Sequence, residues 1–259
     1  MTDRPSQSHI PYEIVNPDAA SRWLITCDHA TNIVPDFVAG GDLGLPAEDM
    51  ARHIAYDIGA AGVTRALAAQ LGCTAILSRF SRLVIDPNRG EDDPTLLMQL
   101  YDGTIIPANR DITADAVETR LNRLYRPYHD ALAELAARRD DTVIVSVHSF
   151  TPQLRGRAPR PWHIGVLHAA DTRLSLALLE RLRDAGAGDD PLCVGRNEPY
   201  GGHLPGDAIS RHALPQGRHN TLIELRNDLI TTPQAQAGWA ARLAPILRAA
   251  LQDADPAGA

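Results

Sequence analysis

Short apolar runs alternate along the chain with longer segments in which apolar residues recur at helical spacing. The apolar runs are bounded by turn residues and predict strands at residues 22–27, 74–79, 83–86, 142–148, 163–168, 191–195 and 220–225. The periodic segments predict helices at residues 47–71, 113–138, 171–185 and 232–252. Strands that alternate with helices are typical of a mostly parallel sheet with helices on both faces. The pattern therefore predicts an α/β fold of three layers, α/β/α, around a mixed, mostly parallel central sheet.

The helical pattern is clearest in residues 113–138. The apolar positions there are Val117, Leu121, Leu124, Tyr128, Leu132 and Leu135. Thr113 or Asp111 is the expected N-cap, because either side chain can accept a hydrogen bond from the first helical turn. Pro127 has no backbone N–H and is expected to kink this helix.

The chain shows no internal repeat and no low-complexity linker. We predict a single domain over residues 1–259, with peripheral arms at about residues 1–20 and 252–259. Three long loops, which have no pattern of secondary structure, connect the predicted elements at residues 87–110, 149–162 and 196–219. Each of them adjoins a strand end that carries polar residues, so we expect these loops to build a functional site.

Composition narrows the class of protein. With 22% charged and 44% hydrophobic residues, the chain is typical of a soluble globular protein, and no apolar run is long enough to cross a bilayer. The formal net charge of −7 argues against a nucleic-acid partner. Three widely spaced cysteines suggest neither a disulfide framework nor a cysteine-based zinc cluster. The N-terminal residues do not resemble a signal peptide, so we expect a cytoplasmic protein.

Polar side chains stand at the ends of four predicted strands. They are Asp28 and His29, then Asp86, Asn88 and Arg89, then His148, and finally Glu224 and Arg226. Ligands of open α/β sheets gather at the carboxyl ends of the strands, so these residues are expected to converge. Two neutral imidazoles and a carboxylate suit zinc and leave a position open for water. This combination favours a metal hydrolase.

A further ligand is expected from the predicted helix 47–71. His53 and Asp57 are four residues apart and would share one face of that helix. Asp28 is an alternative carboxylate ligand, or it orients a histidine or caps the segment that follows.

Several segments resemble the N-formylglutamate amidohydrolase family, in the order in which that family has them. They are "CDHATNIVP", "HIAYDIGAAGV", "SRLVIDPNRG", "YRPYHDAL", "VSVHSFTP" and "NEPYGG". The resemblance covers roughly residues 22–230. More distantly, the strand-end residues are similar to those of zinc carboxypeptidases and aminoacylase-type deacylases. The resemblance implies the phosphorylase/hydrolase-like, zinc exopeptidase-like form of the α/β/α fold.

The resemblance also implies roles for individual residues. His29 and His148 would be ligands of Zn²⁺ or another divalent metal, and Glu224 the general base. Asn88 and Arg89 would hold the substrate carboxylate, since a guanidinium binds a carboxylate bidentately. Arg82 would stabilise the developing oxyanion or hold a second carboxylate.

The sequence departs from the related families at two points. Carboxypeptidases have a ligand glutamate at the position of Asn32, so the third ligand must come from elsewhere, and we predict Asp57. Formylglutamate hydrolases have His-Ser-Gly where this chain has "HAT", which leaves the natural substrate open. We also predict that His203 and Arg226 contact the substrate.

The predicted function is hydrolysis of the N-formyl or another N-acyl amide of an amino acid such as N-formylglutamate. Two alternatives remain open. One is a zinc exopeptidase or another N-acyl amino acid deacylase. The other is a non-catalytic protein that binds an acidic metabolite through Arg82 and Arg89. Simpler roles are also open, in which His148 caps its strand, Glu224 pairs with an arginine such as Arg226, and Arg82 and Arg89 neutralise Asp86. The sequence carries no signal for an oligomeric state.

Overall fold

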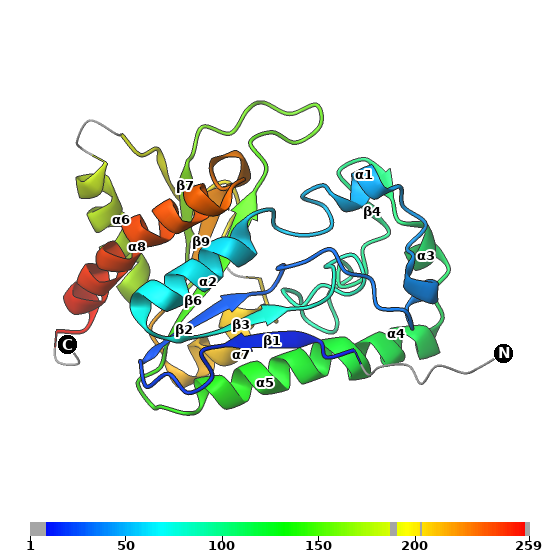
Figure 1. The fold of residues 1–259 in the computed structure, drawn as a ribbon, viewed down its shortest axis with the longest axis horizontal. Helices are drawn as coiled ribbons and strands as arrows, with labels where there is room; N and C mark the ends of the chain where they lie inside the picture. The colour runs from blue at the N-terminus through cyan, green and yellow to red at the C-terminus, as the bar shows by residue number, and fades with distance from the viewer. Residues whose placement is uncertain (1–8, 187–190, 203, 257–259) are drawn as a thin grey trace.

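A computed structural model describes residues 9–186, 191–202 and 204–256. Within these residues, seven strands form one sheet in the order β1-β3-β2-β6-β9-β7-β8 (Figure 1). The strands of this sheet are β1 (Tyr12–Val15), β2 (Trp23–Cys27), β3 (Thr74–Ser78), β6 (Val143–Phe150), β7 (Ile164–Leu167), β8 (Val194–Arg196) and β9 (Asn220–Arg226). Strands β3, β2, β6 and β9 are parallel neighbours. Strand β1 pairs antiparallel with β3, and β7 pairs antiparallel with β9 and parallel with β8. The predicted mixed, mostly parallel sheet is confirmed.

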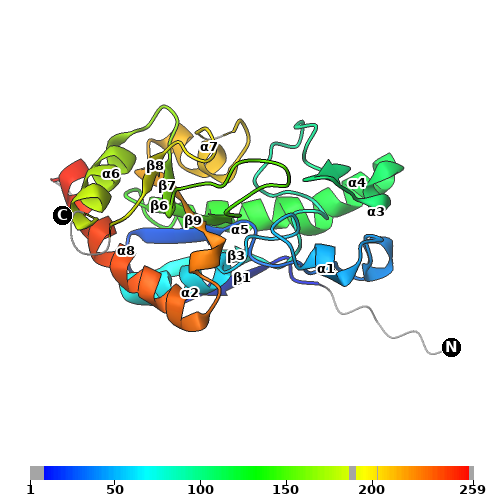
Figure 2. The ribbon, with the colours of Figure 1, turned by 90° about the horizontal axis from the view of Figure 1, so that it is seen from above.

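Helices cover both faces of the sheet, as Figure 2 shows from above. The helices are α1 (Ala47–Met50), α2 (Ala60–Leu71), α3 (Pro107–Arg110), α4 (Ala114–Arg120), α5 (Arg126–Ala136), α6 (Arg173–Ala185), α7 (Ala208–His212) and α8 (Pro233–Ala254). On one face, α2, α6 and α8 pack against residues such as Val145 and Ile223. On the other face, α5 packs against residues such as Leu24 and Ile144. Because strand side chains alternate between faces, the two apolar clusters bury both sides of the sheet and confirm the three layers.

The predicted helix 47–71 is wrong in its middle. Residues 51–59 form turns between α1 and α2, so His53 and Asp57 do not share a helix face. Gly59 precedes α2 with φ of 81°, and a Cβ there would lie 2.3 Å from the carbonyl oxygen of Ile230. The left-handed backbone at Gly59 therefore sets where α2 begins.

The predicted strand 83–86 is also wrong, since this stretch consists of turns and irregular backbone. Side chains supply part of its hydrogen bonds, and turns and a loop supply others, in place of a neighbouring strand. The Asn109 amide donates to the carbonyl of Leu83 at 2.8 Å, and the Arg120 guanidinium donates to the carbonyl of Val84 at 2.7 Å. An apolar run can thus be buried without pairing in a sheet, which its composition does not reveal.

The long predicted helix 113–138 contains an irregular segment. Its N-cap at Thr113 is confirmed, because the side chain accepts a hydrogen bond from the backbone N–H of Ala116. Five residues in π-helical geometry, Leu121–Tyr125, connect α4 to α5. Pro127 lies in the first turn of α5, directly after that segment, where its missing N–H is accommodated.

Some elements are absent from the sequence prediction. Strand β1 lies within the expected N-terminal arm and pairs with β3. Helix α8 was predicted, but it extends to Ala254, two residues beyond the predicted end. The loop 87–110 contains a hairpin, β4 (Leu100–Tyr101) with β5 (Thr104–Ile105), and helix α3, while α7 lies within the loop 196–219. In the part of the chain that the structure describes, no helix has the length and apolar character needed to span a membrane.

Candidate metal and substrate site

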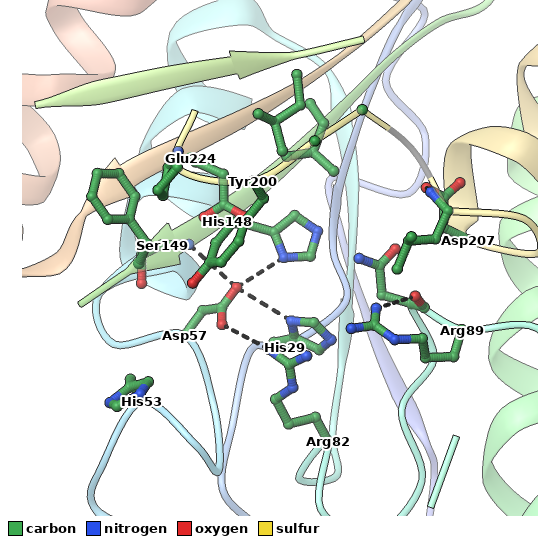
Figure 3. A pocket seen from close by; sticks show the side chains of 18 of the residues that line it. His29, His53, Asp57, Arg82, Arg89, His148, Ser149, Tyr200, Asp207 and Glu224 are labelled. Atoms are coloured by element: carbon green, nitrogen blue, oxygen red, sulfur yellow. Dashed lines mark hydrogen bonds and ion pairs between the residues drawn. The ribbon is translucent and has the colours of Figure 1, made fainter. Parts of the chain in front are cut away.

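A cavity of about 450 Å³ opens at the carboxyl ends of β2, β6 and β9 (Figure 3). Most of the residues predicted for the site line it. They are His29, His53, Asp57, Arg82, Asn88, Arg89, His148 and Glu224. This is the edge where an open α/β sheet places its ligands. The structure therefore brings together residues from five separate parts of the chain.

Two histidines and one aspartate meet at the floor of the cavity. Oδ2 of Asp57 lies 2.8 Å from Nδ1 of His148 and 3.3 Å from Nδ1 of His29. All three side chains are buried, and one potential ligand atom from each lies within 4.8 Å of the others. The predicted trio of His29, Asp57 and His148 is thus assembled, although Asp57 reaches it from a turn and not from a helix.

Backbone hydrogen bonds fix the position of Asp57. Its N–H donates to the carbonyl of His29 at 2.9 Å, which fastens the segment 51–59 to the end of β2. The backbone N–H of Ser149 donates to Oδ2 of Asp57 at 3.2 Å, and the Ser149 hydroxyl donates to the carbonyl of Ile58. The carboxylate is therefore held between the ends of β2 and β6.

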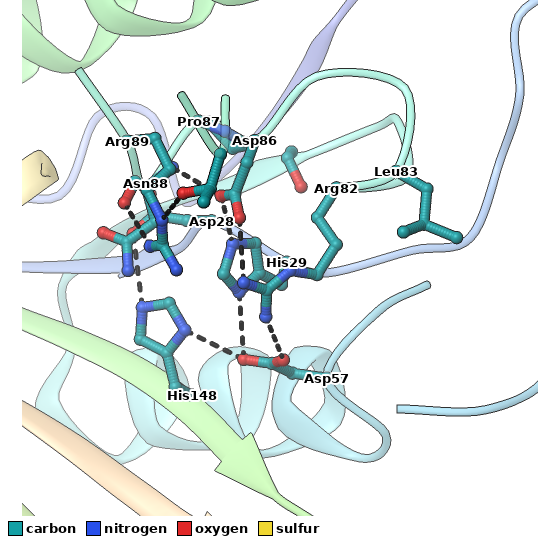
Figure 4. A network of polar contacts seen from close by, with 12 residues as sticks. Asp28, His29, Asp57, Arg82, Leu83, Asp86, Pro87, Asn88, Arg89 and His148 are labelled. Carbon is teal, nitrogen blue, oxygen red and sulfur yellow. Dashed lines mark hydrogen bonds and ion pairs between the residues drawn. The ribbon is translucent and has the colours of Figure 1, made fainter. Parts of the chain in front are cut away.

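Acidic side chains also hold the outer nitrogen of each histidine (Figure 4). Nε2–H of His29 donates to Oδ1 of Asp86 at 2.7 Å. Nε2 of His148 lies 3.3 Å from Oδ2 of Asp28 and 3.0 Å from the hydroxyl of Ser146. A histidine whose outer N–H is bound by a carboxylate presents its other nitrogen as a lone pair, the arrangement usual for metal-ligating histidines.

Three carboxylates, of Asp28, Asp57 and Asp86, are buried around the two histidines, and Arg82 pairs with two of them. Burial alone lowers the pKa of His148, but its contacts with Asp28 and Asp57 outweigh burial and raise that pKa well above the ordinary value. Burial likewise raises the pKa of Asp57, yet His29 and His148 hold it below its usual range. A neutral imidazole has one N–H, so a His29 ring that donates to Asp86 from Nε2 can donate to Asp57 from Nδ1 only when it is protonated. A divalent metal bound at Nδ1 supplies positive charge without that proton. The donor set of two nitrogens and a carboxylate fits zinc.

Arg82 is committed to two of the acidic side chains. Its Nη2 donates to Oδ2 of Asp86 at 2.8 Å, and its Nη1 lies 3.7 Å from Oδ1 of Asp57. Burial raises the pKa of Asp86, but Arg82 and His29 reverse that shift and bring it well below the ordinary value. Of the roles left open for Arg82, the geometry favours charge neutralisation.

Arg89 differs from Arg82 because, among the described residues, it forms no ion pair. Its Nε donates to the hydroxyl of Thr95 at 3.0 Å, and its Nη1 donates to the carbonyl of Asn88 at 2.7 Å. The backbone N–H of Asn88 donates in turn to Oδ1 of Asp86. The guanidinium is thus oriented at the cavity wall, and its charge remains available to an anionic ligand.

Glu224 lies beside His148, because the two residues are partners in the parallel pairing of β6 with β9. Burial, the largest effect, raises the pKa of Glu224 to about 8, with His148 opposing the shift and Asp57 adding to it. One carboxylate oxygen, Oε2, is buried without a hydrogen-bond partner in the described structure. Arg226 pairs with Asp228 at 2.8 Å and is not the partner of Glu224.

Two other predicted residues, His53 and Arg226, lie outside the metal-binding group. His53 lines the cavity, but its Nε2 lies 3.5 Å from Asp102 and it is not part of the metal-binding group. Arg226 is not among the residues that line the cavity, so the predicted substrate contact is not supported. His203 lies outside the described residues. Asn32 donates to the carbonyl of Met50 at 2.8 Å, a structural role that agrees with its being a poor ligand.

Two groups of contacts are not predicted from the sequence. The first involves the acidic residues predicted at strand ends: Asp86, expected at the site, accepts a hydrogen bond from His29, and the hydroxyl of Tyr128 donates to Oδ1 of Asp28 at 2.6 Å. The second lines the cavity: Tyr101, Phe150, Leu167, Pro199, Tyr200, Leu204, Asp207 and Leu222. Strand alternation could have placed Leu222 on the face of Glu224, but the other contacts depend on the paths of loops.

Known proteins resemble this chain over most of its length. Residues 21–231 match the N-formylglutamate amidohydrolase family. The N-formylglutamate deformylase of Pseudomonas aeruginosa is 30% identical over 207 residues, which cover 72% of this chain and 75% of that protein. The N-formylglutamate deformylase of Pseudomonas putida is 29% identical over 224 residues, which cover 78% of each chain.

Solved structures show the same architecture. A gene product of Agrobacterium tumefaciens is 37% identical, with a TM-score of 0.85 over 95% of this chain and 96% of that chain. The N-formylglutamate amidohydrolase from Ralstonia eutropha JMP134 is 23% identical, with a TM-score of 0.63 over 95% of this chain and 97% of that chain. At that identity, the second comparison shows the fold alone.

Proposed function

The chain belongs to the N-formylglutamate amidohydrolase family, and from this premise we propose that it is a metal-dependent amidohydrolase. Its reaction in this proposal is hydrolysis of the N-formyl or another N-acyl amide of an amino acid such as N-formylglutamate. The observation that supports it best is the buried group of His29, Asp57 and His148, with both outer histidine nitrogens held by acidic partners. The net charge of −7 supports a small metabolite over nucleic acid as the ligand, and we propose that the enzyme acts in the cytoplasm.

We propose that His29 and His148, through Nδ1, and Asp57, through its carboxylate, would hold zinc or another divalent metal. Such a cation polarises a carbonyl oxygen and lowers the pKa of water. Asp86 and Asp28 fix the orientation of the two imidazole rings. The chain itself thus supplies a preorganised donor set whose geometry does not depend on the substrate.

In the proposed reaction, Glu224 is the general base. A carboxylate with a pKa near 8 is a stronger base than an exposed glutamate and accepts a proton from the attacking water. The same carboxyl group then gives the proton to the departing amide nitrogen. Its place beside His148 puts the proton acceptor next to the metal-binding group.

Arg89 and Asn88 are the proposed anchors of the substrate carboxylate. The guanidinium is oriented by Thr95 and by the Asn88 carbonyl, so little conformational freedom is lost when a carboxylate binds. Arg82 offsets the charges of Asp57 and Asp86 and, as a cation lining the cavity, opposes the negative charge that develops on the substrate.

Metal analysis and turnover together test the proposal. Purified protein should contain stoichiometric metal and release formate or another acid from N-acyl amino acids. The His148→Ala variant should lose both the metal and the activity, whereas Glu224→Gln should keep the metal and lose most of the activity. Protein without metal, whose affinity for acidic metabolites is unchanged in His148→Ala, would instead identify a binding protein. Release of C-terminal residues from peptides, with no release of acid from N-acyl amino acids, would identify an exopeptidase.

A further inference from the structure

A second cavity, of about 400 Å³, lies between helix α5 and the segment 211–218, which includes the end of α7. Arg211, Gln216 and Arg218 line it from that segment, and Asp130 lines it from α5. Alanine side chains of α5 form another part of the wall, and their small size leaves room for a ligand. None of its described lining residues lines the cavity at the strand ends, so the two cavities are separate.

Two of the lining residues are arginines that form no ion pair within the described part of the chain. Nη1 of Arg211 donates to the hydroxyl of Tyr125 at 2.6 Å, and Nη1 of Arg218 donates to the carbonyl of His212 at 2.9 Å. Both arginines are partly exposed while the cavity is empty, so each has surface that a ligand can contact. Their remaining N–H groups are therefore available to an anion.

Positive charge exceeds negative charge at the wall of the second cavity. Asp130 is the one carboxylate among the described lining residues, and it is exposed. Burial, the largest effect, lowers the pKa of His129 to about 3 and that of His212 to about 4, so both rings are neutral near pH 7. Two guanidinium groups and one carboxylate leave a net positive charge, although the whole chain has a formal charge of −7. The cavity therefore favours an anion.

The two neutral histidines at this wall have assignable protons. Nε2 of His129 lies 3.0 Å from the carbonyl oxygen of Pro87, which only accepts, so Nε2 carries the hydrogen. Nδ1 of His129 is then an acceptor, and Nε2–H of His212 donates to it at 2.9 Å. Nδ1 of His212 is left unprotonated, and no described residue donates to it. The second cavity thus combines cationic donors with one acceptor that has no donor.

Hydrogen bonds to the loop that begins at Pro87 hold this wall in place. The guanidinium carbon of Arg211 lies 5.2 Å from the centre of the Tyr125 ring, and the Tyr125 hydroxyl donates to the carbonyl of Arg89. His129 is fixed in the same way by the carbonyl of Pro87. Donors that are already oriented lose little conformational freedom when a ligand binds.

We propose that the second cavity is a binding site for a phosphate group, held between the guanidinium groups of Arg211 and Arg218. One guanidinium can occupy both oxygens of a carboxylate, whereas a phosphate has enough oxygens for two guanidinium groups. The O–H of a phosphate monoanion also suits the free acceptor of His212, and sulfate has no such hydrogen near pH 7. The group belongs either to inorganic phosphate or to a small phosphomonoester.

Calorimetry with inorganic phosphate, sulfate and glycerol 3-phosphate tests the class of ligand. We expect phosphate to bind the wild type at least about threefold more tightly than sulfate, as one additional hydrogen bond predicts. Equal or tighter binding of sulfate would overturn the assignment to phosphate. Tighter binding of glycerol 3-phosphate than of phosphate would identify a phosphorylated metabolite as the source of the group, and weaker binding would identify inorganic phosphate.

Charge changes at Gln216 test the position of the site. Gln216 is exposed, so its variants should fold, and it lines the second cavity. We expect Gln216→Glu to weaken phosphate binding and Gln216→Lys to strengthen it, each at least about threefold, because a unit charge is added beside the anion. Gln252→Glu and Gln252→Lys are the matched controls, since Gln252 is exposed on α8 and lines neither cavity. Equal effects at both positions would overturn the site.

Two further variants separate the second cavity from the proposed catalytic one. Arg89→Ala and His148→Ala change only the cavity at the strand ends, so both should bind phosphate with the affinity of the wild type. Arg218→Gln should weaken binding at least about 10-fold, as expected on loss of a charged donor. Loss of phosphate binding in Arg89→Ala or His148→Ala, with wild-type affinity in Arg218→Gln, would place the anion in the catalytic cavity and overturn the proposal.

Discussion

His148 and Glu224 are partners on neighbouring parallel strands, and their side chains face the same cavity. The pairing of β6 with β9 thus sets one ligand of the proposed metal site beside the proposed base. A shift of either strand by one residue would turn one of the two side chains to the opposite face of the sheet. The position of His148 relative to Glu224 is therefore set by the sheet, whereas Asp57 is supplied by a turn.

Removing the charge of Asp28 should weaken metal binding. In Asp28→Asn, the acceptor near Nε2 of His148 becomes neutral while the shape of the side chain is kept. We expect metal affinity to fall about 10- to 100-fold, which a competing chelator can measure. Asp253→Asn, at the exposed ion pair with Arg181, is the control and should leave affinity unchanged. Wild-type affinity in Asp28→Asn would show that Asp28 does not orient the ligand.

Glu224→Gln should lower kcat about 10²- to 10⁴-fold without loss of metal, as expected on removal of a general base. In the wild type, activity should rise with pH as Glu224 loses its proton, at a pH no higher than about 8, because a bound cation favours the carboxylate. The profile of kcat/KM against pH checks this. A rising limb that is unchanged in Glu224→Gln would assign the titration to another group.

Substitution of Arg89 should weaken substrate binding more than it slows chemistry. Arg89→Ala removes the guanidinium that, among the described residues, forms no ion pair. We expect KM for N-formyl amino acids to rise at least about 10-fold, with a smaller change in kcat, if the interaction is equally strong in the ground state and the transition state. Arg89→Lys should recover only part of the loss, because it lacks the bidentate fork. An unchanged KM in Arg89→Ala would place the carboxylate elsewhere.

Gly59→Ala should destabilise the protein and disturb the metal site together. The new Cβ would lie 2.3 Å from the carbonyl oxygen of Ile230. Gly59 is two residues after Asp57, so a shift of the backbone there would also move the Asp57 carboxylate. We expect the free energy of unfolding to fall by about 2 kcal/mol or more, and metal affinity to fall as well. Gly72→Ala is the matched control, since it has a similar φ of 62° but no atom within 4 Å of the added Cβ. It should cost about 1 kcal/mol and leave metal affinity unchanged. If Gly59→Ala and Gly72→Ala lowered the free energy of unfolding equally, the contact with Ile230 would not explain the effect of Gly59→Ala.

The metal-free protein should lose stability in acid partly through His129. Burial, aided by Arg211 and His212, lowers the pKa of His129 from 6.5 to about 3. Below pH 6.5 the unfolded chain binds a proton that the folded protein does not take up until about pH 3, so the free energy of unfolding decreases as the pH falls between these values. Urea unfolding at several pH values should show a slope that His129→Gln reduces by about 1 kcal/mol per pH unit. Parallel curves for the two proteins would contradict this assignment.

Local patterns in the sequence predict most of the fold. The spacing of apolar residues identifies the strands β2, β3, β6, β7 and β9 and the helices α2, α5, α6 and α8, because that spacing reports which face of an element is buried. The spacing of apolar residues predicts the wrong structure for residues 83–86 and 51–59, which form turns and irregular backbone. In the first case, side chains of Asn109 and Arg120 satisfy the backbone. In the second, a contact between Gly59 and Ile230 sets the start of α2.

Residue patterns alone place His29, His148 and Glu224 near the carboxyl ends of strands, and a parallel sheet brings those ends to one edge independently of the loop conformations. The tertiary structure was needed to show that Asp57 contacts both histidines and that Arg82 is bound to Asp57 and Asp86. The physical reason is that these contacts depend on where loops and neighbouring strands place side chains from distant parts of the chain. Local periodicity carries no information about those positions.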